Sequence, residues 1–275
     1  MPARPVTLPV APTRPHRYIR GMDEAALLAL ATDLALRAGA AILEIRARGF
    51  AVERKTDLSP VTEADRAAEA LIVAGLRAAA PDIPVIAEEE VSAGRITAPS
   101  AQYWLVDPLD GTREFAAGRD EFAVNIGLVR DGRARLGVVG VPAFNEVFGA
   151  IVGQGAWKRS AAGRHAIAAR TPPGGGLVVL ASRSHGDARR LAAFLDGRTV
   201  ARVEKYGSAL KICRLAEGAA DLYPRFGRTM EWDTCAPQAV LEAAGGALRT
   251  ADGAALGYGK PGWENPDFVC TGRDG

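Results

Sequence analysis

The chain has 275 residues, of which 48% are hydrophobic and 24% charged, and it carries a formal net charge of +2. These values are typical of a soluble globular protein with a sizeable core, in one large domain or in two that share a core, and they argue against disordered and membrane-dominated chains. The mild charge, without a basic stripe interleaved with aromatic residues, argues against a nucleic-acid-binding protein.

Cysteine and histidine usage narrows the chemistry further. Cys213, Cys235 and Cys270 are odd in number and widely spaced, and the chain has only three histidines. This pattern favours neither a disulfide framework nor a zinc site. The sequence predicts no transmembrane segment and no secretory signal. We therefore expect a cytoplasmic protein, and the sequence leaves open a peripheral contact with the inner face of the cell membrane.

The N-terminal third predicts a tail and two long helices. Residues 1–21 carry five prolines, and we expect them to form a disordered tail. Apolar periodicity predicts a helix over residues 23–49, with Asp23 as its N-cap. A short strand over 50–54 precedes a second helix that runs from Thr62 to about Ala80, where a proline stops it.

The central stretch is the motif DPLDGT at residues 107–112, which follows a predicted buried strand over 103–106. Ligands of open α/β sheets lie at strand ends. Pro108 stiffens the turn and helps Asp107 and Asp110 to converge, and converging carboxylates repel each other unless a cation lies between them.

The same turn offers further ligand groups. The Leu109 carbonyl would complete an oxygen donor set that suits Mg²⁺, and the N–H groups of Gly111 and Thr112 permit the close approach of an anion. The sequence thus predicts that metal and phosphate meet here. A surface turn is the alternative interpretation, but a second acidic cluster, residues 88–90, also follows a β-type run, over 83–87, and favours one shared site.

The remaining chain predicts two patterns of secondary structure on either side of a Pro- and Gly-rich joint at residues 170–176. Antiparallel strands are predicted over 122–130, 135–141, 146–151 and 156–159, with a hairpin turn at Asp131-Gly132. Beyond the joint, strands over 177–181, 200–205 and 220–223 alternate with helices over 187–195, 208–217 and 234–244, before a last strand over 268–270. This alternation predicts a sheet sandwiched by helices.

Three ordered motifs, at residues 86–89, 104–112 and 232–233, make the chain resemble the inositol monophosphatase superfamily of Mg²⁺-dependent, lithium-sensitive phosphatases. Residues 113–115, 182–185, 207–211 and 220–233 make it similar, within that superfamily, to the bisphosphate nucleotidase branch. The likeness covers residues 25–270.

The resemblance implies a layered αβαβα sugar-phosphatase fold, of mixed α+β and α/β class. An N-terminal α+β half over 22–170 would carry the metal site, and a C-terminal α/β half over 171–275 would complete one phosphatase unit. Asp65, Glu88 and Thr112 would be catalytic, with Asp65 and Thr112 orienting the attacking water. The implied metal ligands are Glu88, Asp107, the Leu109 carbonyl, Asp110 and Asp233. The implied substrate-binding residues are Glu88, Leu109, Asp110, Gly111, Thr112, Ser182, His185, Ser208, Lys211, Arg225 and Asp233.

The implied reaction is hydrolysis of the 3'-phosphate of adenosine 3',5'-bisphosphate (PAP) to give AMP. A side reaction would convert its sulfated relative PAPS to APS, and both reactions would belong to sulfur metabolism. Two or three Mg²⁺ ions would be bound, Li⁺ would inhibit, and the protein would be a monomer or a homodimer. Phosphatases for inositol phosphate, histidinol phosphate or fructose 1,6-bisphosphate share the same metal motifs, and a non-catalytic Mg²⁺ and nucleotide-binding module is a rival of another class.

Other local interpretations stay open at individual residues. Asp233, before the helix predicted over 234–244, could be an ordinary N-cap, and Thr62 to Asp65 could be an ordinary helix N-terminus. The chain departs from the superfamily pattern at Ala87 and at Cys235-Ala236-Pro237. We expect Pro237 in a first helical turn, where its missing N–H is tolerable.

Overall fold

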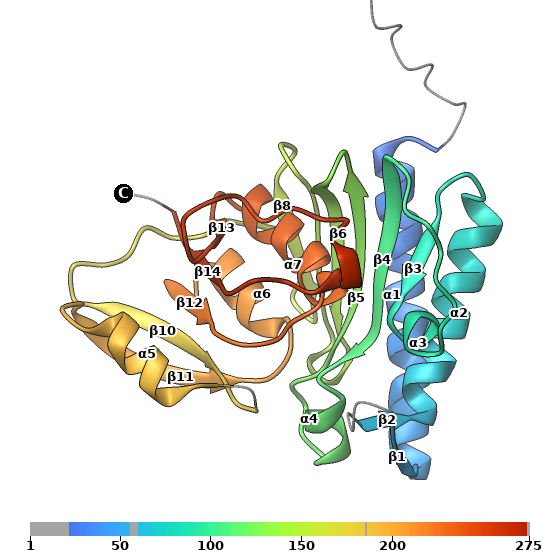
Figure 1. The fold of residues 1–275 in the computed structure, drawn as a ribbon, viewed down its shortest axis with the longest axis horizontal. Coiled ribbons are helices and arrows are strands. Elements are labelled where there is room, and N and C mark those ends of the chain that lie inside the picture. The colour runs from blue at the N-terminus through green and yellow to red at the C-terminus, as the bar shows by residue number, and fades with distance from the viewer. Residues whose placement is uncertain (1–21, 56–59, 185, 274–275) are drawn as a thin grey trace, which may run out of the picture.

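The computed structural model describes residues 22–55, 60–184 and 186–273. The predicted tail over residues 1–21 and His185 lie outside this part of the chain. Figure 1 shows alternating layers across the molecule: helices α1 and α2, a first sheet, helices α6 and α7, a second sheet, and helix α5. The predicted layered αβαβα fold is confirmed.

The first sheet has seven strands in the order β3-β4-β5-β6-β7-β8-β9, antiparallel except for the parallel pair β3 and β4. Its strands are β3 (Val85–Ala87), β4 (Gln102–Asp110), β5 (Ala123–Arg130), β6 (Arg133–Val141), β7 (Glu146–Ile151), β8 (Ala156–Ser160) and β9 (Gly163–Ile167). The β5–β6 turn has Asp131 at φ +50° and Gly132 at φ +70°, as the predicted Asp-Gly hairpin requires.

Two long helices cover one face of this sheet. Helix α1 (Glu24–Arg48) begins at the Asp23 N-cap, and α2 (Glu63–Ala79) begins at Thr62. They pack on each other, with α1 against β6 and α2 against β4. By length and composition α1 is also apolar enough to cross a membrane, with a mean hydropathy of 1.7. Eight residues of α1 are buried in the protein, and the expected absence of a transmembrane segment stays a prediction.

The second sheet has five strands in the order β11-β10-β12-β14-β13, with β10 parallel to β11 and β12. Its strands are β10 (Leu177–Ser182), β11 (Val200–Tyr206), β12 (Leu222–Arg225), β13 (Ala247–Thr250) and β14 (Phe268–Thr271). Helices α6 (Leu210–Ala216) and α7 (Glu231–Ala243) lie between the sheets, and α5 (Ala188–Leu195) lies beyond the second one (Figure 1). Because α7 packs on β5 and β6, the two sheets share a core.

The remaining elements are short. They are the antiparallel pair β1 (Val52–Arg54) and β2 (Pro60–Thr62), the helices α3 (Glu88–Ser92) and α4 (Thr112–Ala116), and the 3₁₀ turns η1 (Pro142–Phe144) and η2 (Pro261–Trp263). The division at residue 170 stays a prediction. The last strand of the first sheet ends at Ile167 and the first strand of the second begins at Leu177, on either side of the predicted joint.

Two elements differ from their predicted bounds in ways that concern the site. Strand β4 continues to Asp110, because Asp107 and Asp110 both pair with β5, and the register shifts between them, around Pro108. Helix α7 begins at Glu231 and not at residue 234, so Asp233 lies in the first turn and Pro237 lies inside the helix. The expected place of Pro237 in a first turn was therefore wrong.

Strands β9 and β13 were not predicted. Strand β9 is an edge strand whose residues are mostly exposed, so it lacks the alternation of apolar and polar residues that marks a half-buried strand. Strand β13 has only four residues, and it is fixed by antiparallel pairing with β14. Both strands depend on a partner strand more than on their own sequence.

Close packing of α7 on the first sheet gives a stability prediction. A β-carbon at Gly137 of β6 would lie 2.1 Å from the Ala236 carbonyl oxygen in α7, whereas one at Gly140 on the same strand would meet only ordinary contacts at 3.6 Å. We expect Gly137→Ala to lower the free energy of unfolding by about 1–3 kcal/mol through overpacking. Thermal and urea unfolding measure this, with Gly140→Ala as the matched control. Equal stability of the two variants would contradict the close packing.

Candidate active site

A buried aspartate–threonine pair joins helix α2 to helix α4. The carboxylate of Asp65 accepts hydrogen bonds from the Thr62 backbone N–H and hydroxyl, both at 2.7 Å, on one oxygen. The Thr112 hydroxyl donates to its other oxygen at 3.0 Å, and lies 3.0 Å from the Leu109 carbonyl oxygen. Burial raises the pKa of Asp65, and the hydrogen bonds from Thr62 oppose this shift. The capping box of α2 thus fixes one side of a pair that spans 47 residues.

The end of β4 places two aspartates on the same pocket. Asp107 is buried, and its carboxylate accepts the Leu109 N–H at 3.0 Å. The carboxylate of Asp110 accepts the Ala209 N–H, which comes from the loop before α6, and the Asn125 amide at 3.3 Å. The predicted convergence follows from the shift in strand register between the two aspartates, which brings both side chains to one face.

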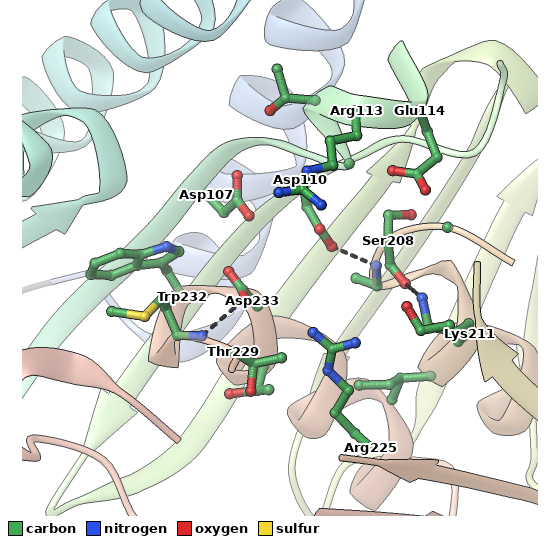
Figure 2. A pocket seen from close by; sticks show the side chains of 18 of the residues that line it. Asp107, Asp110, Arg113, Glu114, Ser208, Lys211, Arg225, Thr229, Trp232 and Asp233 are labelled. Atoms are coloured by element: carbon green, nitrogen blue, oxygen red, sulfur yellow. Dashed lines mark hydrogen bonds between the residues drawn. The ribbon is translucent and has the colours of Figure 1, made fainter. Parts of the chain in front are cut away.

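Glu88 and Asp233 approach the same pocket from opposite sides. Glu88 is the first residue of α3, directly after β3, and Asp233 lies in the first turn of α7, where its carboxylate accepts the Met230 N–H at 2.9 Å. Both line a cavity of about 340 Å³ together with Asp107, Asp110 and Thr112. Figure 2 shows Asp107, Asp110 and Asp233 pointing towards one another.

Burial and nearby negative charge raise the pKa values of the three aspartates. Burial, with repulsion from Glu88, Asp110 and Asp233, raises the pKa of Asp107 well above its ordinary value. Burial, together with the charges of Asp110 and Glu88, raises the pKa of Asp233 to about 8. Burial raises the pKa of Asp110 to about 6, although Lys211 and the Ala209 N–H oppose it. Such groups lose their strain on binding a cation or a proton.

The donor set fits a hard divalent cation, because every candidate ligand is a carboxylate or carbonyl oxygen. Among the described residues, however, no three Asp, Glu, His or Cys side chains are close enough together to hold a metal ion as they stand. Glu88 is paired with Lys55, and Asp110 accepts the Ala209 N–H.

Lys55 was not predicted as a site residue. Its ammonium lies 2.7 Å from Glu88 and 2.6 Å from Glu89, and its side chain is only 10% exposed. Burial by itself lowers the pKa of Lys55, but the two glutamates raise it above its ordinary value. A single lysine in a loop before an acidic helix start is a weak sequence signal, and only the tertiary structure brings it to Glu88, 33 residues away.

The opposite wall of the pocket contains the predicted substrate-binding residues. Ser182, Ser208, Lys211 and Arg225 line the cavity, and Figure 2 shows the last three on the side opposite Asp107. Lys211 is buried, and it donates to the Ser208 carbonyl at 2.6 Å and to the Tyr206 carbonyl at 3.3 Å. Burial lowers its pKa to about 8. Lys211 therefore holds the loop before α6 as well as facing the pocket.

Gly111 shows why the turn after β4 needs glycine. Its φ is +91°, and a β-carbon there would lie 3.1 Å from the Glu121 carbonyl oxygen and 3.3 Å from the Ser208 side chain. Gly111 is therefore enclosed by backbone of the loop before β5 and by a side chain of the loop before α6. The Gly111 conformation therefore sets the distance between the DPLDGT turn and the loop before α6.

A layered αβαβα fold with acidic residues gathered around a DPLDGT turn defines a phosphatase of the inositol monophosphatase type. The sequence profile of the Inositol monophosphatase family matches residues 23–272, and the chain belongs to this family. Both the predicted superfamily and its fold are thereby confirmed.

Named relatives lie in the nucleotidase branch. The chain is 43% identical over 241 residues to the 3'(2'),5'-bisphosphate nucleotidase CysQ of Escherichia coli K12, covering 86% of this chain and 96% of the relative. The structure of this chain is similar to that of CysQ from Bacteroides thetaiotaomicron, with a TM-score of 0.76 and 35% identity, covering 91% of this chain and 98% of that one. It is also similar to an inositol monophosphatase from Zymomonas mobilis, with a TM-score of 0.75, 25% identity and coverage of 90% and 93%.

Repulsion among the acidic residues gives a second prediction. Mg²⁺ at about 100 times its dissociation constant should stabilise the protein by about 2.7 kcal/mol over EDTA-treated protein. The carboxylate of Asp233 keeps its proton up to about pH 8 when folded but loses it near pH 4 when unfolded. The stability of the EDTA form should therefore fall as pH rises from 6 to 8. Thermal unfolding at both pH values measures this.

Asp107→Asn provides the internal comparison for this measurement. Removing one charge from the cluster should stabilise the EDTA form and reduce the Mg²⁺-dependent rise in melting temperature. A variant with the full Mg²⁺ response of the wild type would show that Asp107 is not part of the cation site.

Proposed function

We propose that this protein hydrolyses the 3'-phosphate of adenosine 3',5'-bisphosphate, giving AMP and phosphate, in an Mg²⁺-dependent reaction. The observation that carries the proposal is the arrangement at the end of β4, where four acidic residues from three elements face one cavity beside the Asp65–Thr112 pair. The nucleotidase relatives, at 43% and 35% identity over most of the chain, support this choice of substrate.

Five groups would hold the cations: the carboxylates of Glu88, Asp107, Asp110 and Asp233 and the carbonyl of Leu109. Bound Mg²⁺ supplies charge that lowers the pKa of a water molecule and neutralises the leaving oxygen. Two or three ions fit the number of oxygen donors, and inhibition by Li⁺ is part of the same proposal. Lys55 would hold the Glu88 carboxylate in place until a cation takes its position.

The Asp65–Thr112 pair would orient the attacking water. Because the Thr112 hydroxyl donates its hydrogen to Asp65, its lone pairs remain to accept a hydrogen bond from water. The water attacks phosphorus in line, the bond from phosphorus to the ribose 3'-oxygen breaks, and that oxygen takes up a proton as AMP leaves. The pair contributes by positioning, and the buried Asp65 is itself held by Thr62.

The opposite wall would bind the rest of the nucleotide. The N–H groups of Gly111 and Thr112 would receive the reacting phosphate. Ser182, Ser208, Lys211 and Arg225 line the same cavity and would bind the ribose and the 5'-phosphate. His185 belongs to the predicted set, but it lies outside the described residues. Two cationic side chains facing one cavity favour a doubly phosphorylated ligand over a monophosphate.

The proposal also covers the side reaction, the cellular location and the oligomeric state of the enzyme. Hydrolysis of PAPS to APS would be a side reaction, and both reactions belong to sulfur metabolism. We propose a cytoplasmic enzyme that acts on small phosphorylated molecules, as a monomer or a homodimer. Peripheral contact with the inner face of the cell membrane stays a prediction from the sequence.

A panel of phosphate esters tests the function. Phosphate release is measured from adenosine 3',5'-bisphosphate, inositol 1-phosphate, fructose 1,6-bisphosphate and histidinol phosphate, with Mg²⁺, with EDTA and with added Li⁺. We expect kcat/KM for the nucleotide to exceed the others by at least about tenfold, with loss of activity in EDTA and inhibition by Li⁺. Preference for another ester would assign the chain to a different phosphatase of the family, and no hydrolysis at all would favour a binding module.

The threonine hydroxyl can be tested separately. Thr112→Ala removes the group that orients the water, and we expect kcat to fall about 100-fold or more with little change in KM. Thr112→Ser keeps the hydroxyl and should retain most of the activity, so it is the matched control. Equal activity of the two variants would remove Thr112 from the mechanism.

A further inference from the structure

An ion pair outside the metal site joins the two sheets beside the pocket. Glu121 lies in the loop between α4 and β5, and Arg183 follows β10. The carboxylate of Glu121 accepts two hydrogen bonds from the Arg183 guanidinium, at 2.7 and 2.9 Å. Both side chains are partly buried, with 16% of Glu121 and 32% of Arg183 exposed. A bidentate pair of this kind fixes orientation as well as distance.

The same two residues hold the loop between β11 and α6. The Arg183 backbone N–H donates to the Tyr206 carbonyl at 3.1 Å, and its guanidinium donates to the Lys205 carbonyl at 2.7 Å. Glu121 accepts the Gly207 N–H at 2.9 Å. Arg183 and Glu121 thus contact three consecutive residues, 205–207, at the end of β11 and the start of the loop.

Gly207 leaves no room for the loop to sit differently. A β-carbon at this position would lie 2.6 Å from the Glu114 side chain and 2.7 Å from the Glu121 carbonyl oxygen. Glu114 is buried, and its carboxylate accepts the Ser184 hydroxyl at 2.5 Å, next to Arg183 in the chain. The loop therefore rests directly on the N-terminal half of the protein, between two glutamates.

Ser208 follows at once, and it has a left-handed backbone with φ at +49°. Its side chain lines the pocket, while Lys211 and Ala209 tie the following residues to Ser208 and to Asp110. The loop therefore has two supports. Residues 209–211 are held on the side of Asp110, and residues 205–207 are held by contacts with Arg183 and Glu121. A positive φ at a serine is unfavourable unless neighbouring contacts hold it.

We infer that the Arg183–Glu121 ion pair positions the 206–209 loop for binding of the nucleotide, and so determines affinity for the adenosine bisphosphate over simple phosphate esters. The inference rests on the proposed function. Arg183 and Glu121 act through Ser208 and the loop, and they are positioning residues with no part in the chemical step. Loss of the pair removes the guanidinium contact with the Lys205 carbonyl and weakens the support of Gly207, while Ala209 and Lys211 keep the metal-site side in place.

Arg183→Met tests this inference by removing the ion pair while keeping a side chain of similar length. KM for adenosine 3',5'-bisphosphate should rise about tenfold with kcat within about twofold, because only binding interactions are lost. For p-nitrophenyl phosphate, which lacks the nucleoside and the second phosphate, kcat/KM should stay within about twofold of the wild type. The control is Arg135→Met, which removes a bidentate pair with Glu24 of similar exposure, and neither residue lines the pocket.

Glu121→Gln is the second variant, because it keeps the shape of the side chain while removing the charge that Arg183 needs. The same selective rise in KM in both variants, with unchanged melting temperatures, would support the inference. Equal loss on both substrates, or no change in KM, would overturn it. A wild-type protein that hydrolyses p-nitrophenyl phosphate but not the bisphosphate would instead refute the proposed function, and with it this inference.

Discussion

Repulsion among carboxylates in one pocket is the constraint on which this structure depends. Glu88, Asp107, Asp110 and Asp233 come from three separate elements, α3, β4 and α7, and burial together with nearby negative charge shifts the pKa values of the three aspartates upwards. A protein gains nothing in stability from such a cluster. The fold gives three of these carboxylates an internal partner in place of water. Lys55 pairs with Glu88, the Ala209 N–H donates to Asp110, and the Met230 N–H donates to Asp233.

The layered architecture explains how four distant segments meet. Helix α7 lies between the two sheets and packs on glycines of the first one, where a β-carbon at Gly127 or Gly137 would clash with the helix. This close approach brings the first turn of α7 to the end of β4. Because the same layer carries α6, the loop before α6 reaches Asp110 from the other side. The pocket therefore lies where the first turn of α7 and the loop before α6 meet the end of β4.

Two kinds of contact keep the halves in register around the pocket. Buried packing of α7 sets the distance between the layers, and polar contacts, such as those of Glu114 and Glu121, hold the loops at the rim of the pocket. Packing forces are short-ranged and non-directional, whereas bidentate hydrogen bonds fix angles.

Local sequence determined the family motifs, the long helices and the Asp-Gly hairpin, because capping, periodicity and turn chemistry act over a few residues. The DPLDGT motif also predicted the convergence of Asp107 and Asp110, since the two lie three residues apart. Only the tertiary structure decided that Lys55 pairs with Glu88, that Asp233 belongs to the first turn of α7, and that strands β9 and β13 form. These features depend on partners far along the chain, and nothing in the local sequence specifies which partner will be met.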